Sequence, residues 1–372
     1  MKMKNQAIDD ISKYAAPHRD RWHYLDYSDG KHTGAYTEWK YLNFIQGDLA
    51  GYIIYYVLDP ELRTSLGSGR IMARVLRGEE FHGGIDKIPM SEIEFDTHTA
   101  SARFGNARLN EKTPHNYQIT GSVAGISWDL EYNQSTPTLD GFKDVNFGIL
   151  PWEKASWLVK MPRARITGAI SINSKHIQLN ALGYSDTNWG EFVPFLSRYE
   201  WAQFNDEKIS VVLGVIYRWG AVWKTYAYAE INKEIINFDS ETFKIIERKW
   251  GREKITGIMT PVKTRFEIKG GPSTGESADF VARPADHGPV GPSTGADHGP
   301  VGPYTLDCAY APARTDMLSL KISSWLPKPC VAEQISRFSG TLKHNGNIVH
   351  SFAGLGFSEY SPKTWKNTAV TF

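Results

Sequence analysis

The residues with the clearest potential for chemistry lie in one stretch, which runs from residue 181 to 205 as ALGYSDTNWGEFVPFLSRYEWAQFN. A carboxylic acid, Asp186, and a carboxamide, Asn188, stand there among seven aromatic residues. A carboxyl group held against aromatic rings loses hydration, so we expect Asp186 to keep a proton near neutral pH and to act as a general acid. Asn188 can hydrogen-bond this acid or a substrate oxygen. By residue types alone, an ordinary aromatic strand of a β core is the more frequent explanation of such a stretch.

Two acids outside this stretch, Glu38 and Glu359, are secondary candidates for the same chemistry. For both, a hydrogen-bonded structural carboxylate at the end of a strand is the alternative. Aromatic, amide and imidazole side chains could line an apolar binding site, although packing is the commoner role for a single Tyr, Trp or His on a strand. Besides the two acids, the candidates for substrate binding are Trp189, Trp201, Tyr199, Phe192, Gln203, Trp39, Tyr217, Trp223 and His176.

Sequence signatures of several other enzyme classes are absent. The chain has no Gly-x-Ser-x-Gly nucleophile elbow, no His-Glu-x-x-His motif, no P-loop and no Rossmann glycine pattern. Two Asp-His pairs, at 286–287 and 297–298, lie in a Gly/Pro-rich tandem repeat, where adjacent residues of a flexible segment make a poor metal site. We therefore expect neither a metal ion nor a redox cofactor.

Composition limits the partners and the compartment. The chain has 372 residues, a formal net charge of +1 and no basic block interleaved with aromatics, so we expect no nucleic acid partner. No run of about 18 apolar residues is present, which predicts no membrane span. The N-terminal stretch lacks the apolar core of a signal peptide, and the two cysteines, Cys308 and Cys330, do not require a disulfide. The prediction is a cytoplasmic protein or one at the membrane periphery.

Short β-type segments separated by Gly and Pro turns follow one another along the chain, and long amphipathic helical patterns are absent. The predicted fold class is therefore all-β, with hairpins around Gly47-Asp48 and around Asn173-Ser174. We predict an N-terminal arm over residues 1–35, a first β domain over 36–150 and a second over 151–372. The segment 270–303 repeats ADHGPVGP, lacks the large apolar residues of a core and is predicted to be a flexible insertion.

Four short motifs resemble one family signature. Residues 183–190, GYSDTNWG, have the form Gly-Tyr-x-Asp-x-Asn-Trp-Gly, and residues 201–203, WAQ, follow with Tyr199 in place of a preceding Trp. Residues 38–41, EWKY, resemble Glu-Trp-Trp-Tyr, and residues 354–360, GLGFSEY, resemble Gly-x-Gly-x-x-Glu-Tyr. In this order the motifs resemble those of the carotenoid 1,2-hydratases (hydroxyneurosporene synthases), tocopherol cyclases and AttH-like lipocalin-type proteins.

The resemblance implies two lipocalin-like (calycin-type) β-barrel or β-sandwich halves with a ligand cavity between or within them. It also implies chemistry on long apolar molecules without a metal or redox cofactor. The leading hypothesis is a cyclase of natural-product biosynthesis, acid-initiated or of the pericyclic Diels–Alder type, with a polyene, terpenoid, polyketide or prenylated substrate. Asp186, Asn188 and Tyr184 would be its catalytic residues. The alternatives are an alkene hydratase or isomerase and a non-catalytic carrier of a hydrophobic ligand, and the oligomeric state stays open.

Overall fold

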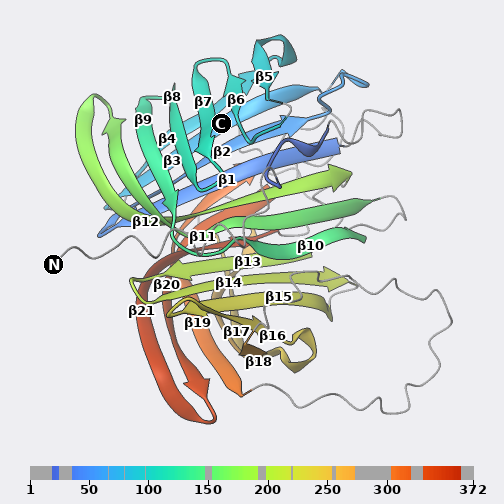
Figure 1. Ribbon diagram of the computed structural model, residues 1–372, viewed down its shortest axis with the longest axis vertical. Helices are drawn as coiled ribbons and strands as arrows, with labels where there is room; N and C mark the ends of the chain where they lie inside the picture. The colour runs from blue at the N-terminus through green and yellow to red at the C-terminus, as the bar shows by residue number, and fades with distance from the viewer. Residues whose placement is uncertain are drawn as a thin grey trace. The chain divides into compact units, whose positions relative to one another are not determined.

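The computed structural model describes residues 19–24, 36–65, 67–78, 80–96, 98–146, 153–191, 198–218, 221–253, 257–272, 303–319 and 330–361. Most of these residues belong to the antiparallel strands of two sheets (Figure 1), which confirms the predicted all-β class. The chain separates into two compact units. Residues 1–198, 317–331 and 361–372 form the first, and residues 199–316 and 332–360 form the second.

The first unit contains a twelve-stranded, nearly closed, barrel-like sheet. Along its edge-to-edge path the order is β4-β3-β2-β1-β12-β11-β9-β8-β7-β6-β5, and β10 also pairs with β11. The strands are β1 (Tyr36–Gln46), β2 (Leu49–Leu58), β3 (Ser68–Arg77), β4 (Glu80–Ile88), β5 (Ile93–Phe95), β6 (Ala102–Phe104), β7 (Ala107–Thr113), β8 (Asn116–Val123), β9 (Ile126–Gln134), β10 (Leu139–Asn146), β11 (Lys154–Ile172) and β12 (Lys175–Glu191). The 3-10 helix η2 (Met90–Glu92) leads into β5.

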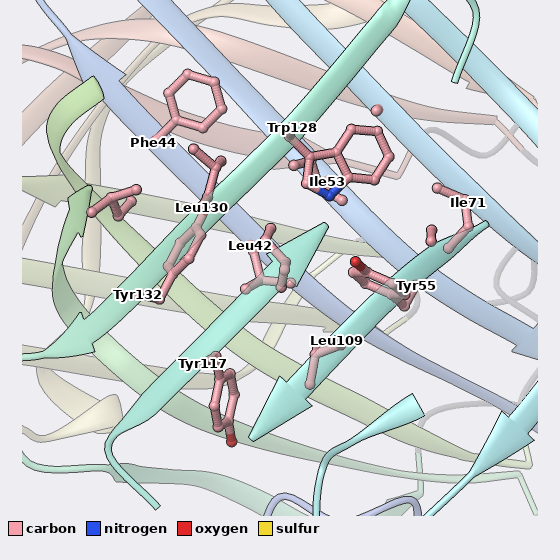
Figure 2. Packing of buried hydrophobic residues seen from close by; sticks show 14 of the residues in the cluster. Leu42, Phe44, Ile53, Tyr55, Ile71, Leu109, Tyr117, Trp128, Leu130 and Tyr132 are labelled. Carbon is pink, nitrogen blue, oxygen red and sulfur yellow. The ribbon is translucent and has the colours of Figure 1, made fainter. Parts of the chain in front are cut away.

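Alternate side chains of each strand point to one face of this sheet and form its core. In β9, Ile126, Trp128, Leu130 and Tyr132 are buried while Ser127 and Asp129, which alternate with them, are exposed, as the two-residue period of a strand requires. Figure 2 shows Trp128, Leu130 and Tyr132 packed with apolar side chains of β1, β2, β3, β7 and β8. The face that carries this cluster is called the inner face of the first sheet below.

The hairpin of β11 and β12 carries the signature motif. Its turn residues, Asn173 and Ser174, both have positive φ, at 47° and 68°, which is the conformation of a tight two-residue hairpin turn. The predicted hairpin around this pair is therefore confirmed. β12 then lies between β11 and β1, so the motif occupies the middle of the sheet.

The second unit contains a nine-stranded, ring-like sheet. The order is β16-β15-β14-β13-β21-β20-β19-β18-β17, and a further pairing of β16 with β18 closes the ring. The strands are β13 (Arg198–Asn205), β14 (Ile209–Arg218), β15 (Ala221–Ile231), β16 (Glu234–Phe238), β17 (Lys244–Arg252), β18 (Met259–Pro272), β19 (Tyr304–Ser319), β20 (Cys330–His344) and β21 (Asn347–Tyr360). The 3-10 helix η3 (Ser240–Thr242) joins β16 to β17. The inner face of this nine-stranded sheet holds a second apolar cluster that includes Phe204, Leu213, Phe266, Leu306 and Phe338.

Two features of the structure differ from the predicted boundaries. The sequence places the start of the second domain at residue 151, whereas β11 and β12, which follow that point, hydrogen-bond within the first sheet. The predicted insertion begins at residue 270, whereas Gly270–Pro272 still pair with β16 as the end of β18. Backbone pairing with distant strands decides both boundaries. Residues 273–302 lie outside the described residues.

Candidate functional site

The signature motif presents its side chains to two different faces of the first sheet. Ser185, Thr187 and Trp189 follow Leu179 and Ala181 of the core cluster at two-residue spacing, so they lie on the inner face. Tyr184, Asp186 and Asn188 therefore lie on the outer face of the same strand. One strand thus separates the motif into two groups of residues with different surroundings.

On the outer face, Asp186 is the centre of a hydrogen-bonded group. Its side chain accepts hydrogen bonds from Trp157 Nε1 at 2.9 Å, from the Tyr184 hydroxyl at 2.7 Å and from Asn188 Nδ2 at 3.3 Å. These four residues are called the Asp186 cluster. Asp186 is buried, and donors on both of its oxygens satisfy an ionised carboxylate. The structure thus brings together the three residues predicted as catalytic and adds Trp157, with Asp186 as an acceptor that orients its donors.

Aromatic rings of neighbouring strands surround the Asp186 cluster on this face. The register places Tyr41 opposite Asp186 and Trp39 opposite Asn188. Tyr41 contacts the ring of Tyr184 edge-on at 6.3 Å and stacks on Tyr52 at 6.0 Å. Rings at these distances attract one another by dispersion and by their quadrupoles. Aromatic rings therefore lie near Asp186 and Trp39 is among them, whereas Trp189 of the same motif lies on the inner face.

On the inner face, Glu38 and Trp189 hold the N-terminal segment. The Glu38 carboxylate accepts hydrogen bonds from the backbone N–H of His23 at 2.9 Å and of Tyr24 at 3.2 Å, and from the Tyr36 hydroxyl at 2.9 Å. The His23 ring stacks on Trp189 with 3.6 Å between centroids. These contacts match the structural alternative for Glu38, since they use its oxygens to fix another part of the chain.

A buried ionic network fixes the same segment. Asp20 receives a hydrogen bond from Lys40 Nζ at 2.9 Å and another from the Tyr117 hydroxyl at 2.7 Å. Burial alone would raise the pKa of Asp20, but the charges of Lys40 and Lys160 together with the hydrogen bonds from Thr187 and Tyr117 outweigh burial and lower it. Trp22 is fully buried and donates its indole N–H to the carbonyl of Ala100 at 3.0 Å. Residues 19–24 therefore belong to the core of the first unit.

In the second unit, Glu359 lies in a row of side chains across three strands. The register pairs Glu359 of β21 with Glu333 of β20 on one side and with Trp201 of β13 on the other. These three residues, called the Glu359 row, lie on the outer face of the ring, because Phe338 and Ala202 mark the inner face. Glu333 and Trp201 are buried and Glu359 is partly buried.

The Glu359 carboxyl group titrates near neutral pH. Burial raises its pKa to about 7, and hydrogen bonds from the Tyr199 hydroxyl and with Glu333 oppose part of that rise. Gln203 of β13 and Phe357 of β21 pair two residues further along these strands, so they lie on the same outer face as the Glu359 row. Four residues predicted for substrate binding, Glu359, Trp201, Tyr199 and Gln203, thus share one face of neighbouring strands.

A further carboxylate cluster, centred on Glu200, lies inside the ring and was not predicted from the sequence. Glu200 accepts hydrogen bonds from the Tyr217 hydroxyl at 2.6 Å and from the Tyr310 hydroxyl, and it forms an ion pair with Arg248. The Arg248 guanidinium also lies 5.6 Å from the centre of the Tyr217 ring. Tyr217 therefore belongs to a structural ion-pair network on the inner face of the ring. The three partners of Glu200 are 17, 48 and 110 residues away, so no local pattern could indicate them.

The remaining predicted residues lie apart from these clusters. His176 is exposed near the hairpin turn of β12, where it contacts Ser171 and Gln178. Trp223 is partly buried, with Lys224 Nζ 5.2 Å from the centre of its ring. Phe192 lies outside the described residues. Cys308 is a free thiol in the core of the second unit.

The part of the chain that the structure describes contains no group of three or more His, Cys, Asp or Glu side chains placed to hold a metal ion. It also contains no helix with the length and apolar character needed to cross a membrane.

Comparison with known proteins identifies the fold. No protein-family model matches the chain, and no curated protein matches it by sequence. A solved structure assigned to AttH, NE1406 of Nitrosomonas europaea, matches 94% of this chain and 99% of its own with a TM-score of 0.60 at 13% identity. This chain shares the fold of that structure.

The protein CghA has the same architecture. Its structure matches 89% of both chains with a TM-score of 0.57 at 11% identity. Its complex with the small molecule Sch210972 matches 88% of this chain and 89% of its own, with a TM-score of 0.56 at 12% identity. These structural matches show a shared fold. At identities this low they do not extend to substrate or reaction, which depend on the residues of this chain.

Proposed function

We propose that this protein is a cofactor-independent cyclase that acts on a hydrophobic polyene or prenylated substrate. The observation that carries the proposal is Glu359, a carboxyl group that titrates near neutral pH and lies directly across from Trp201 in the pairing of β21 with β13. Ring closure of an unsaturated chain needs an apolar surface that folds the chain and a group that donates a proton or a hydrogen bond. The Glu359 row offers both on one face of three neighbouring strands.

Glu359 is assigned the role of donor in this proposal. A protonated carboxyl group can transfer its proton to an alkene, or hydrogen-bond a carbonyl and polarise the conjugated system attached to it. Trp201 supplies a ring face that stabilises positive charge developing on carbon. The sequence favoured Asp186 for this role, but the three donors around Asp186 make it the less suitable proton source.

Within the first unit, the Asp186 cluster is assigned a separate role, that of orienting a ligand. Asp186 fixes the orientations of the Tyr184 hydroxyl, the Trp157 indole and the Asn188 amide. Fixed polar groups among aromatic rings determine how an apolar molecule with few oxygens is oriented. The small molecule in the CghA complex is consistent with ligand binding by this fold.

An alkene hydratase or isomerase is the second candidate, because the same proton donor starts hydration. A non-catalytic carrier is the third. A carrier gains nothing from a carboxyl group that titrates near neutral pH, so the Glu359 row favours an enzyme over a carrier.

Deletion of the gene in its own host tests the proposed function. Extracts of deleted and parent cells are compared by mass spectrometry, and purified protein is then incubated with the molecule that accumulates. A cyclase predicts accumulation of an open-chain molecule with the same elemental composition as the missing product. A missing product that contains one more water molecule would indicate a hydratase, and an unchanged set of molecules would contradict an enzymatic role.

Variants then test the assignment of Glu359. We expect Glu359→Gln to lower turnover by about 10²-fold or more if a proton is transferred, because the amide cannot supply it. Glu80→Gln is the matched control, since the Glu80 side chain is 81% exposed on β4 of the first unit. Equal turnover of the two variants would remove Glu359 from the proposed site.

A further inference from the structure

A row of side chains crosses the outer face of the first sheet beside the Asp186 cluster. The register pairs Asn188 of β12 with Trp39 of β1, Trp39 with Tyr56 of β2, and Tyr56 with Arg70 of β3. Residues paired in this way carry their side chains on the same face of a sheet. Ile71, next to Arg70, belongs to the core cluster of the inner face, so these four residues lie on the outer face. They are called the Arg70 row.

Contacts along the Arg70 row hold the guanidinium group of Arg70 in place. The ring of Trp39 stacks on the ring of Tyr56 with 6.2 Å between centroids. The guanidinium carbon of Arg70 lies 5.5 Å from the centre of the Tyr56 ring, where the ring attracts a cation. Tyr56 is buried, whereas Trp39, Arg70 and Asn188 are partly exposed. Tyr56 therefore positions Arg70, and the three partly exposed side chains are the ones that a ligand can contact.

The positive charge of Arg70 has no anionic partner among the described residues. Its Nη1 atom is buried and has no hydrogen-bond acceptor there, and the guanidinium forms no ion pair with a described carboxylate. A buried N–H group without an acceptor loses its hydrogen bonds to water and gains none in return. An anionic oxygen of a ligand would supply the missing acceptor and the missing charge.

The carboxylates that precede Arg70 in the chain are used within their own loop. Asp59, directly after β2, accepts hydrogen bonds from the backbone N–H groups of Arg63 at 3.0 Å and of Thr64 at 2.7 Å. Glu61 forms an ion pair with Arg63 at 2.5 Å. Both carboxylates therefore stabilise the connection from β2 to β3, and the structure shows neither of them paired with Arg70.

The other charged side chains on this face favour an anionic ligand. Lys87 of β4 pairs with Arg70 in the register and is exposed, and Arg74 of β3 donates its Nη1 group to the carbonyl of Gly83 at 2.6 Å. On the outer face of β12 and of β1 to β4, Asp186 is the one acidic side chain. It is three strands away from Arg70, about 14 Å, and is held by its own three donors.

We propose that the Arg70 row binds an unsaturated carboxylic acid, with the carboxylate on Arg70 and the carbon chain across Trp39 toward Asn188. A guanidinium group can donate two parallel hydrogen bonds to a carboxylate, and an indole ring offers an apolar surface to the chain. The inference rests on the proposed function, because it makes this acid the substrate. It goes further in naming the acidic group of the substrate and the residue that recognises it.

Binding of a fluorescent probe tests the inference without any need for turnover. The probes are a conjugated tetraenoic fatty acid, which fluoresces in apolar surroundings, and its methyl ester, which has the same chain but no charge. We expect wild-type protein to bind the acid about 10-fold or more tightly than the ester, because the carboxylate pairs with Arg70. This preference should decrease in about 1 M salt, since the site is partly exposed and its charges are screened.

Replacement of Arg70 separates charge recognition from folding. Arg70→Gln should lose most of the preference for the acid while its affinity for the ester stays close to that of wild type. A merely structural role of Arg70 would weaken binding of both probes alike. Arg108→Gln is the matched control, because it removes a positive charge from an exposed position on β7 of the same unit and should keep the preference.

Replacement of Trp39 tests the place of the chain. Trp39→Leu should weaken binding of the acid and of the ester equally, because both probes contact the ring through their chains. Equal affinity of the wild-type protein for acid and ester, no binding of either probe, or an unchanged preference in Arg70→Gln would each overturn the inference. Selective binding of the acid together with unchanged extracts of the deleted cells would support the Arg70 site and contradict the proposed cyclase.

Discussion

At the scale of single residues, Asp186 and Glu359 show how hydrogen-bond partners decide the chemistry of a carboxyl group. Both lie beside aromatic rings, and both look suitable as acids from their sequence context. Asp186 accepts hydrogen bonds from three donors, so its charge is satisfied within the first unit. Glu359 instead faces a second glutamate, and its proton is retained to about pH 7.

The raised pKa of Glu359 predicts a pH dependence of stability. The folded chain binds this proton more tightly than the unfolded chain, where the pKa is about 4.5, so the free energy of unfolding falls as the pH rises from about 4.5 to 7. The contribution is at most about 3 kcal/mol, and the partial exposure of Glu359 reduces it. Urea denaturation at about pH 5 and pH 8 should show a smaller loss of stability for Glu359→Gln than for wild type. An identical loss in both would contradict the raised pKa.

Replacement of Asp186 should cost stability. In Asp186→Asn, the new amide N–H group must face at least one of the three donors, which leaves buried groups without an acceptor. We expect a loss of about 1–3 kcal/mol in urea denaturation followed by tryptophan fluorescence. Asp48→Asn in the exposed β1–β2 turn is the control, with an expected change within about 0.5 kcal/mol. Equal effects of the two replacements would argue against the Asp186 cluster.

At the scale of elements, the two faces of β12 have different contacts and different roles. The inner side of the motif anchors residues 19–24 through the stack of Trp189 on His23, and the outer side presents the Asp186 cluster. Central position in the sheet makes this possible, since β1 and β11 flank β12 over the whole motif. The motif therefore holds residues 19–24 against the first sheet and also forms a candidate site.

Gly190 is the residue of this motif that should tolerate substitution least. Its φ is +144°, and a Cβ atom there would lie 2.1 Å from the carbonyl oxygen of Lys154 on β11. We expect Gly190→Ala to lower the free energy of unfolding by about 3 kcal/mol or more, because a backbone clash between paired strands adds to the strained φ. Gly47→Ala is the control: its φ is also positive, at +62°, but nothing lies within 4 Å, so about 1 kcal/mol is expected. Similar urea midpoints for the two variants would contradict the close approach of β11.

At the scale of the whole molecule, each unit has its own sheet and its own apolar cluster. The ring of the second unit is closed by the contact of β16 with the last residues of β18, and Gly270 of β18 pairs with Tyr304 of β19. The two ends of the segment 273–302 are thus held in neighbouring strands by pairing that does not involve the segment.

Removal of the repeat segment should therefore cost little. Replacing residues 273–302 by a four-residue Gly/Asn turn keeps the pairing of β18 with β19 and shortens the loop that must be closed on folding. We expect a melting temperature within a few degrees of the wild-type value and an unchanged circular dichroism spectrum. A collapse of the melting temperature would mean that the repeat contributes to the folded core. The earlier boundary at residue 270 would cut into β18, so a deletion that includes Gly270–Pro272 is expected to be more damaging.

The local pattern of the sequence was sufficient for the all-β class and for the β1–β2 and β11–β12 hairpins. Each of these depends on neighbours within a few residues, through two-residue alternation and turn residues that accept positive φ. The rings around Asp186, by contrast, come largely from the distant strands β1, β2 and β11. Local alternation also divides the motif into two faces, although it does not say which face is the inner one.

Only the tertiary structure decided which acid keeps its proton and which partners it has. Glu333 meets Glu359 because a bulge shifts the β20–β21 register by one residue, and Asp20 meets Lys40 because residues 19–24 fold into the first sheet. Glu200 likewise finds Arg248 and Tyr310 only when the ring closes. Strand register and ring closure depend on the summed packing of distant segments, and a shift of one residue moves every side chain to the opposite face. For this reason the residue types of the sequence set out the candidate acids, and the pairing of distant strands selected among them.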